Sequence, residues 1–340
     1  MAEIVLTGIK PTGEVHLGNY LGAIRPAIDT TSQSADTSLL FIADYHSLTS
    51  MHKGEDLRHS IYNVAATWIA CGLDTSKSIL YKQSDIPEIF ELQWILSCFT
   101  PKGFMNRAHA YKAKLDANQA DGKKDLDHGV NMGLYNYPVL MSADILMFNS
   151  TKVPVGEDQI QHLEFARDIA QKFNNNYGDT FTLPEPITKK DSLIPGLDGR
   201  KMSKSYNNGI PLFLDSKKLR KKVMKIKTDS SPPESPKDPD DSLIFDLYKY
   251  FSTDEEQNQL AETYRAGIAW GEAKQILFEK IENYFTEKKE VYDDLMADTG
   301  RLDQILDDGA QRAPVLGLAV GAEGFVRWVE SRRHPVHLCL

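Results

Sequence analysis

Five consecutive residues, Lys201 to Ser205, have types and spacing suited to phosphate chemistry. Two lysines stand three positions apart and are interleaved with two serines. Gly196 and Gly199 precede them, which predicts a loop able to bring two positive charges to a polyphosphate. Taken alone, the run could also be a solvated basic loop.

A second segment, Gly13 to Asn19, follows a short apolar run and opens a predicted helix. His16 and Asn19 are three residues apart, so we expect them to share one face of that helix. Gly18 lets a nucleotide approach the backbone, and the helix N-terminus favours a phosphate. We interpret His16 as stabilising charge that develops at an α-phosphate, although a surface histidine in a turn is the alternative. Together with the lysine loop, this segment predicts a nucleotide-activating enzyme.

Asp144 stands out because it falls on an apolar helix face. Met141, Ile145 and Phe148 mark that face with a spacing of three, four and seven residues. A carboxylate there is costly without a partner. An internal ion pair or hydrogen bond is one interpretation, and an acceptor for an N–H or O–H group of a ligand is the other.

The polar run Gly156-Glu157-Asp158-Gln159 follows a short apolar stretch, 153–155, and opens another predicted helix. Its side chains could hold a ribose and an α-amino group. A helix cap formed by Asp158 is the alternative, and the two roles are compatible.

These residues need a scaffold, and the pattern predicts an α/β one. Strands are expected at 3–7, 39–48, 78–85 and 151–155, with helices at 17–29, 55–71, 88–99, from 138 and at 158–173. Such alternation indicates a Rossmann-like, doubly wound parallel sheet, with ligands beyond the carboxyl ends of its strands.

The domain organisation follows from composition. Residues 101–136 are polar and irregular and look like an insertion, 174–200 are rich in loops, and the acidic, proline-rich stretch 228–242 indicates a linker. Beyond it the pattern is helical to about residue 332. We therefore expect a catalytic domain at 1–205 and an all-helical C-terminal domain at 206–340.

The overall composition is that of a soluble globular protein, with 41% hydrophobic and 26% charged residues. No apolar run is long enough for a membrane span, and the first residues lack a secretory signal pattern. The three cysteines form no CxxC pair, which indicates a reducing compartment and no zinc site. Two of them lie in apolar helical sequence, which is typical of inert core thiols. We expect a cytoplasmic protein without a protein-bound metal.

The net charge of −9 argues against binding of nucleic acid over the whole protein surface, so a nucleic-acid partner needs a local basic patch. The segment 217–227 contains seven lysines and arginines and no acidic residue. A solvated helix face and a phosphate-contacting face are both open interpretations of it.

Together these segments resemble the class I aminoacyl-tRNA synthetases, and among them the bacterial tryptophanyl-tRNA synthetases. TGIKPTGEVHLGNYLGA is similar to a variant first signature, and GRKMSKS matches the second. YPVLMSADILMF, VPVGEDQIQHLEFARDIAQKFN and KKVMKIKTDS resemble that family's own segments. The resemblance covers about residues 3–325 and implies the class I synthetase fold.

The resemblance implies a two-step reaction: tryptophan attacks the α-phosphorus of ATP, and the adenylate then esterifies tRNA(Trp). ATP with Mg²⁺ and a homodimer are implied too, with the insertion and neighbouring helices at the interface and the helices at 243–332 reading the anticodon. The implied catalytic residues are His16, Asn19, Lys114, Lys201 and Lys204. Backbone groups of Leu193 or Ile194 would meet adenine. The implied ATP-binding set is Lys10, Pro11, Thr12, Gly18, Asn19, Gly156, Glu157, Asp158, Ile194, Lys201, Met202, Ser203, Lys204 and Ser205.

In the implied tryptophan pocket, Asp144 accepts the indole N–H and Gln159 binds near the amino-acid head group. The other residues that would line or orient it are Leu6, Thr7, Gly8, His46, Tyr137, Met141, Val153 and Val155. Three positions depart from the family: Lys10 replaces a frequent glutamine, His16 a frequent threonine, and Ala110 another frequent glutamine. A tyrosyl-tRNA synthetase, a small-molecule adenylyltransferase and a catalytically silent tRNA-binding paralogue are the alternatives.

Overall fold

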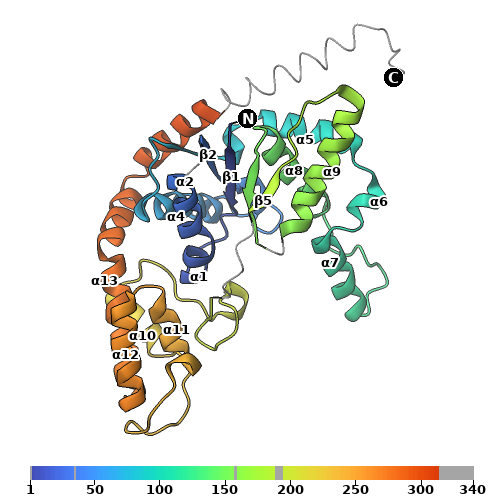
Figure 1. Ribbon diagram of the computed structural model, residues 1–340. Coiled ribbons are helices and arrows are strands. Elements are labelled where there is room, and N and C mark those ends of the chain that lie inside the picture. The colour runs from blue at the N-terminus through green and yellow to red at the C-terminus, as the bar shows by residue number, and fades with distance from the viewer. Residues whose placement is uncertain (1, 34–35, 157–158, 188–193, 314–340) are drawn as a thin grey trace, which may run out of the picture.

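Five parallel strands form the central sheet of the protein (Figure 1). The structure is a computed structural model that describes residues 2–33, 36–156, 159–187 and 194–313. The strand order is β3-β2-β1-β4-β5, so the chain builds outward from β1 first on one side and then on the other. The switch point therefore lies between β1 and β4, and in such sheets ligands bind there, beyond the carboxyl ends. The strands are β1 (Ile4–Ile9), β2 (Thr37–Ile42), β3 (Ser78–Lys82), β4 (Lys152–Pro154) and β5 (Glu185–Ile187).

Both faces of this sheet are covered by helices, because apolar side chains alternate across each strand. Leu40 and Ile42 of β2 belong to one apolar core, whereas Leu39 and Phe41 belong to the other. The doubly wound fold expected from the sequence is confirmed. The first core includes α2 (Arg25–Gln33) and α4 (Gly54–Ala70), and the second includes α5 (Glu88–Phe99), α8 (Met132–Leu146) and α9 (Ile160–Tyr177).

The structure differs from the sequence-based expectation at several element ends. The strand expected at 39–48 stops at Ile42, because Asp44 begins the short helix α3 (Asp44–Ser47). The expected helix 17–29 is three pieces: α1 (Leu17–Asn19), a π-helical turn (Tyr20–Ile24) and α2. The last strand, β5, lies in a stretch that had been interpreted as loop.

The segment 101–136, expected to be irregular, contains the helices α6 (Lys102–Met105) and α7 (His109–Ala120) and the first turn of α8, which begins at Met132 and not at the expected residue 138. Figure 1 shows α7 projecting from the body of the molecule, away from α1. Asn118 on α7 is buried and its amide donates to the carbonyls of Leu126 and His128 at 2.7 and 2.8 Å. These bonds tie the following loop to the helix.

The C-terminal part is helical as expected, as far as the structure describes it. Its helices are α10 (Ser216–Val223), α11 (Leu243–Lys249), α12 (Asp254–Ala266), α13 (Trp270–Ala297) and a further helix at 299–313. The long helix α13 runs along one side of the molecule and packs against α4, α10 and α11 (Figure 1). Tyr20 packs edge-on against Phe285 at 5.2 Å between ring centroids. One apolar core therefore contains residues from both sides of the predicted domain boundary. The domain boundary at 205/206 stays a prediction.

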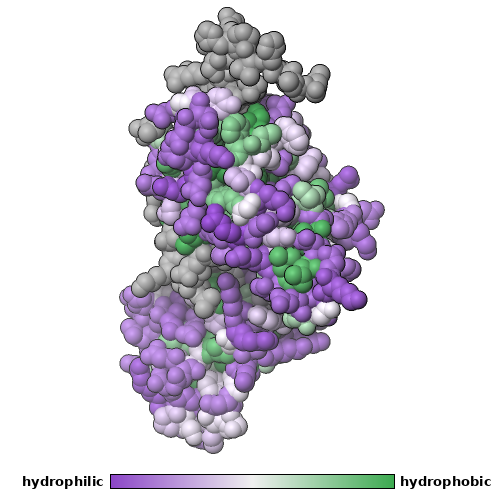
Figure 2. All heavy atoms as spheres, turned by 90° about the vertical axis from the view of Figure 1, so that its right-hand side faces the viewer, coloured by the Kyte–Doolittle hydropathy of each residue, from purple (hydrophilic) through white to green (hydrophobic). Residues whose placement is uncertain are grey.

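No helix in the described ranges is long and apolar enough to cross a membrane. The surface that carries α6, α7 and α9 is mostly polar, with a few separate apolar patches (Figure 2). Trp94 on α5 and Met132 at the start of α8 are 71% and 66% exposed, which is high for large apolar side chains.

Candidate active site

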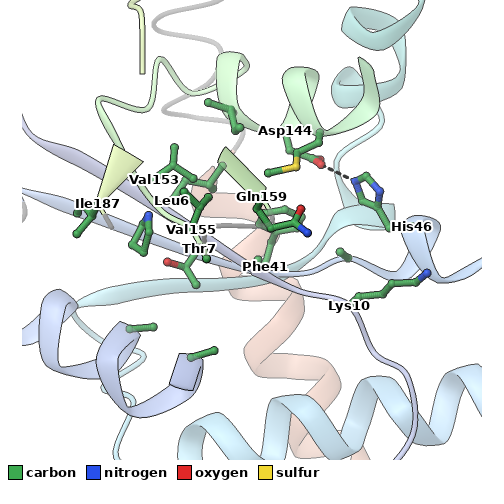
Figure 3. A pocket seen from close by; sticks show the side chains of 18 of the residues that line it. Leu6, Thr7, Lys10, Phe41, His46, Asp144, Val153, Val155, Gln159 and Ile187 are labelled. Carbon is green, nitrogen blue, oxygen red and sulfur yellow. Dashed lines mark hydrogen bonds and ion pairs between the residues drawn. The ribbon is translucent and has the colours of Figure 1, made fainter. Parts of the chain in front are cut away.

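A cavity of about 570 Å³ lies at the switch point between β1 and β4 (Figure 3). This volume is typical of a site for a small molecule. Its wall is mostly apolar and is built by the ends of the two strands, by α8 and by α2. The structure brings together all the side chains that the sequence placed around an amino-acid substrate: Leu6, Thr7, Gly8, His46, Tyr137, Met141, Asp144, Val153, Val155 and Gln159.

Asp144 is fully buried in the wall of this cavity. One carboxylate oxygen is 2.9 Å from Nε2 of His46 (Figure 3). The other accepts a 2.8 Å hydrogen bond from Nε2 of Gln83. A carboxylate offers about four acceptor positions, so these two partners leave capacity for a ligand donor. Both interpretations of Asp144 are therefore compatible: internal partners hold it, and it faces the cavity.

Phe41 is a wall residue that sequence reasoning missed. A Cβ atom on Gly8 would lie 2.4 Å from the Phe41 ring, so Gly8 is needed for the ring to close this side. A phenylalanine in an apolar strand is normally interpreted as a core residue. Its position near the carboxyl end of β2 was the one feature that could have indicated a place in the cavity wall. Gln83 is not part of the wall but donates to Asp144, and it was missed because it lies inside the strand expected at 78–85, which ends at Lys82. The other wall residues not predicted are Gly22, Ala23, Pro26, Ala27, Thr30, Ala43, Thr49, Leu134, Ile145, Pro154 and Ile187.

The two signature segments lie together, although they are far apart in sequence. The ammonium group of Lys204 donates to the carbonyl oxygen of Thr12, 192 residues away in the chain. Next to this contact, Leu17 N–H donates to Ile210 O and Leu212 N–H to Val15 O, each at 2.9 Å. The lysine loop is thus fixed beside the start of α1.

His16 is the N-cap of α1. The sequence-based expectation that it lies on a face of this helix is therefore wrong. Its Nδ1 accepts from Asn19 N–H at 3.3 Å, while Asn19 Oδ1 accepts from His16 N–H at 3.2 Å. This capping box uses Nδ1 as an acceptor, so the ring proton of the neutral tautomer is on Nε2. Burial, and secondarily the charge of Lys204, lower the pKa of His16 to about 4. His16 is therefore a neutral N–H donor at pH 7.

This pKa shift predicts a dependence of stability on pH. Because the folded pKa of about 4 lies below the ordinary 6.5, the unfolded chain binds more protons between these values. The contribution of His16 is therefore complete above pH 6.5 and is lost as the pH falls toward 4. We expect a loss of about 2 kcal/mol at pH 5 relative to pH 7. Urea unfolding of wild type and His16→Gln at both pH values isolates this contribution, and identical changes in the two proteins would contradict it.

The backbone at Gly18 is held by the second signature. Its N–H donates to the sulfur atom of Met202 at 3.1 Å, and a Cβ atom on Gly18 would lie 3.1 Å from Met202 Cβ. A side chain at Gly18 would therefore push the two segments apart. Met202 is buried, and its own N–H donates to Ile194 O at 2.8 Å.

Lys10 directly follows the last residue of β1 at the edge of the cavity. Its ammonium donates to Thr49 Oγ1 at 2.8 Å and to Ser50 Oγ at 3.3 Å, and it lines the cavity. Burial lowers its pKa. Pro11, the next residue, contributes a carbonyl that accepts from Ser47 Oγ at 3.1 Å. The ammonium group is thus held by two hydroxyl groups at the edge of the cavity.

The remaining predicted residues are spread over the site. Ser203 and Ser205 bond to one another through their hydroxyls at 2.8 Å, and Lys201 is exposed. Gly156 lines the cavity. Lys114 is on the projecting helix α7, with its ammonium beside Gly129, so it is not brought to Lys204 in this structure. Glu157, Asp158 and Leu193 lie outside the described residues.

No group of three or more His, Cys, Asp or Glu side chains in the described part of the chain is arranged to hold a metal ion. A magnesium ion that accompanies ATP does not require one, because Mg²⁺ is commonly held by substrate phosphates and water. The described structure does place two ammonium groups nearby: Lys10 lines the cavity, and Lys204 contacts Thr12 of the first signature segment.

Comparison with known proteins identifies the family. Residues 2–286 match the family described as tRNA synthetases class I (W and Y). Tryptophan–tRNA ligase of Neisseria meningitidis is 53% identical over 310 residues, which cover 91% of this chain and 92% of the relative. The structure of tryptophanyl-tRNA synthetase from Campylobacter jejuni complexed with ADP and tryptophan has a TM-score of 0.86 at 42% identity and covers 94% of this chain and 98% of that one. The chain therefore belongs to the class I tRNA synthetases for tryptophan and tyrosine, and within them to the tryptophanyl-tRNA synthetases.

Proposed function

We propose that this protein is a tryptophan–tRNA ligase. It activates L-tryptophan with ATP, releases pyrophosphate, and transfers the tryptophanyl group from the adenylate to tRNA(Trp). The observation that carries this proposal is a buried carboxylate, Asp144, in an otherwise mostly apolar cavity beside the paired signature segments. The names of the relatives agree with it: the Neisseria protein is a tryptophan–tRNA ligase, and the Campylobacter structure holds ADP and tryptophan.

In this proposal the indole ring occupies the cavity and its N–H donates to Asp144. His46 and Gln83 orient the carboxylate, and Gln159 binds near the α-amino end. Phenylalanine would leave the buried acceptor unpaired, and such sites can reject the wrong substrate by about 10⁴–10⁵. Tyrosine carries a hydroxyl donor, so the shape of the wall, including Phe41, must contribute to its exclusion.

The activation step forms a bond between a carboxylate oxygen of tryptophan and the α-phosphorus of ATP, and it breaks the bond from that phosphorus to the pyrophosphate oxygen. Charge stabilisation and positioning dominate such a transfer. Lys201 and Lys204 follow the departing pyrophosphate, and His16 donates its Nε2–H near the α-phosphate. Ser203 and Ser205 add hydrogen bonds. A Mg²⁺ ion bound to the triphosphate would be held by substrate phosphates and water and would neutralise part of the phosphate charge.

Other nucleotide contacts follow the same logic. The phosphate-bearing part of ATP contacts residues of both signature segments: Pro11, Thr12, Gly18, Asn19 and Met202. The backbone at Ile194 contacts adenine. Gly156, Glu157 and Asp158 hold the ribose. Lys114 is proposed to reach phosphate, which requires α7 to approach the lysine loop from its position in Figure 1.

The C-terminal region and the insertion are the parts of the chain proposed to meet larger partners. The C-terminal helices provide the tRNA-binding surface, and the seven cations at 217–227 supply local positive charge in an acidic protein. A cytoplasmic homodimer is proposed, and two exposed apolar side chains, Met132 in the insertion and Trp94 on the preceding helix α5, support an interface there. Analytical ultracentrifugation tests the dimer, and a monomer at micromolar concentration would contradict it.

Amino-acid-dependent exchange of pyrophosphate into ATP tests the function. We expect exchange with tryptophan, little with tyrosine, and subsequent charging of tRNA(Trp). Exchange with tyrosine would indicate the other branch of the family. Retained tRNA binding without any exchange would indicate a catalytically silent protein, and tRNA-independent transfer to a small molecule would indicate an adenylyltransferase.

A further inference from the structure

The side-chain amide of Asn208 lies beneath the lysine loop and is almost completely buried. Its Oδ1 accepts from Ser203 N–H at 2.8 Å. Its Nδ2 donates to Lys201 O at 3.1 Å and to Asp198 Oδ1 at 2.7 Å. The orientation of the amide is fixed by these partners, because one is a donor and the other two are acceptors.

This amide therefore supports, through hydrogen bonds, the backbone of the loop that carries both lysines. It holds the carbonyl of Lys201 and the N–H of Ser203, one residue before Lys204. Two observations indicate that the fit is tight. A Cβ atom on Gly196 would lie 2.3 Å from Asn208 Nδ2, and Asn207 has a left-handed φ of 48° that turns the chain toward the loop.

The same short segment joins the loop to the first signature. Asn208 O accepts from Leu197 N–H at 2.9 Å, and a Cβ atom on Gly209 would lie 3.4 Å from the His16 ring. Ile210 O then accepts from Leu17 N–H. A change in the position of Asn208 would thus shift the lysines relative to His16.

We propose that Asn208 is a positioning residue that aims Lys201 and Lys204 at the triphosphate, through the backbone of the loop and without touching the substrate itself. This proposal rests on the proposed function, because it assigns Asn208 to the activation step. Asp198 supports the amide from the other side. It accepts from Arg200 Nε at 2.8 Å, and its hydrogen bonds from Asn208 and Arg200 lower its pKa to about 2, so it stays a charged acceptor.

Asn208→Asp separates this role from packing, because the two side chains have nearly the same shape. The new carboxylate still accepts from Ser203 N–H but faces Asp198 and the Lys201 carbonyl without a proton to donate. We expect kcat of pyrophosphate exchange to fall about 100-fold, as for a displacement of about 1 Å at a reacting group. KM and the dissociation constant for tryptophan should stay within about twofold, because the loop does not line the cavity.

A double-mutant cycle with Lys204→Ala decides whether Asn208 acts through the lysine. In the wild-type background Lys204→Ala should lower kcat by about 10²–10³-fold. In the Asn208→Asp background the same change should cost less than about 10-fold, because the lysine is already misplaced. An equal penalty in both backgrounds would overturn the proposal and leave Asn208 a merely structural residue.

Three further measurements keep the outcomes separate. Asn176→Asp, on the exposed surface of α9, controls for the added charge and should leave exchange unchanged. If Asn208→Asp does not fold, Asn208→Ala is used in the same cycle with the same expectations. Absence of tryptophan-dependent exchange in the wild type would refute the proposed function, whereas normal exchange in both Asn208 variants would refute only the role of Asn208.

Discussion

Asp144→Ala is expected to lower kcat/KM for tryptophan activation by about 100-fold, while the affinity for ATP alone changes less than about twofold. A hydrogen bond to a charged group contributes about 1.5–3 kcal/mol, and its loss is felt at the indole end of the substrate only. Asp144 is fully buried and lines the cavity, whereas the lysine loop contacts a different segment, at Thr12. Steady-state exchange and equilibrium dialysis with ATP measure the two effects.

Asp144→Asn is the matched control, since it keeps the volume and one acceptor oxygen but removes the charge. We expect an intermediate loss of kcat/KM. Alanine also leaves His46 and Gln83 without their partner, so thermal unfolding should accompany the kinetics. Exchange that survives Asp144→Ala with an unaltered dependence on tryptophan would show that the cavity has been assigned to the wrong ligand.

Lys204→Ala should lower kcat of activation by about 10²–10³-fold and leave KM for tryptophan nearly unchanged. The ammonium stabilises charge that develops on the departing pyrophosphate, an interaction made mainly in the transition state. In the structure it is held by Thr12, beside the buried His16. Burial lowers the pKa of Lys204, because the charged form is less well solvated there than at the surface. An anionic partner such as a phosphate would stabilise this charged form.

Lys77→Ala is the control for this variant, because that side chain is 80% exposed and pairs only with Asp74 among the described residues. It should leave exchange unaffected. Single-turnover kinetics separates binding from chemistry. If Lys204→Ala weakened only the ground-state complex, with a normal rate of adenylate formation at saturation, the role in the transition state would be refuted.

Much of the fold could be predicted from periodicity. Strands β1 and β3 and helices α4 and α5 lie within a few residues of the expected ranges, because each is apolar with clear turn residues at its ends. Strand β5 has three residues, of which two are exposed, so it carries no apolar run. The strand expected to reach residue 48 failed for a different reason: α3 begins at Asp44 directly after the apolar run 39–43, and no glycine or proline marks the end of the strand.

More of the candidate site than of the helix and strand boundaries could be predicted from the sequence. Asp144 stood out because a carboxylate interrupts an apolar face, and the lysine loop because of its charge spacing. The sequence could not predict the hydrogen-bond partners that other elements of the fold bring to these residues. Gln83 and Asn208 are both polar residues near turns, and only the folded chain places them against Asp144 and the lysine loop. His16 was assigned to a helix face because residue spacing does not reveal which residue caps the helix.

The central claim is that a buried carboxylate selects tryptophan by accepting its indole N–H. The most direct test compares tryptophan with its benzothiophene analogue, in which sulfur replaces the N–H in a ring system of similar shape. Wild-type protein should activate the analogue with kcat/KM at least about 100-fold lower than tryptophan, because the acceptor at Asp144 is left unpaired. Equal kcat/KM values for the two compounds would contradict the account.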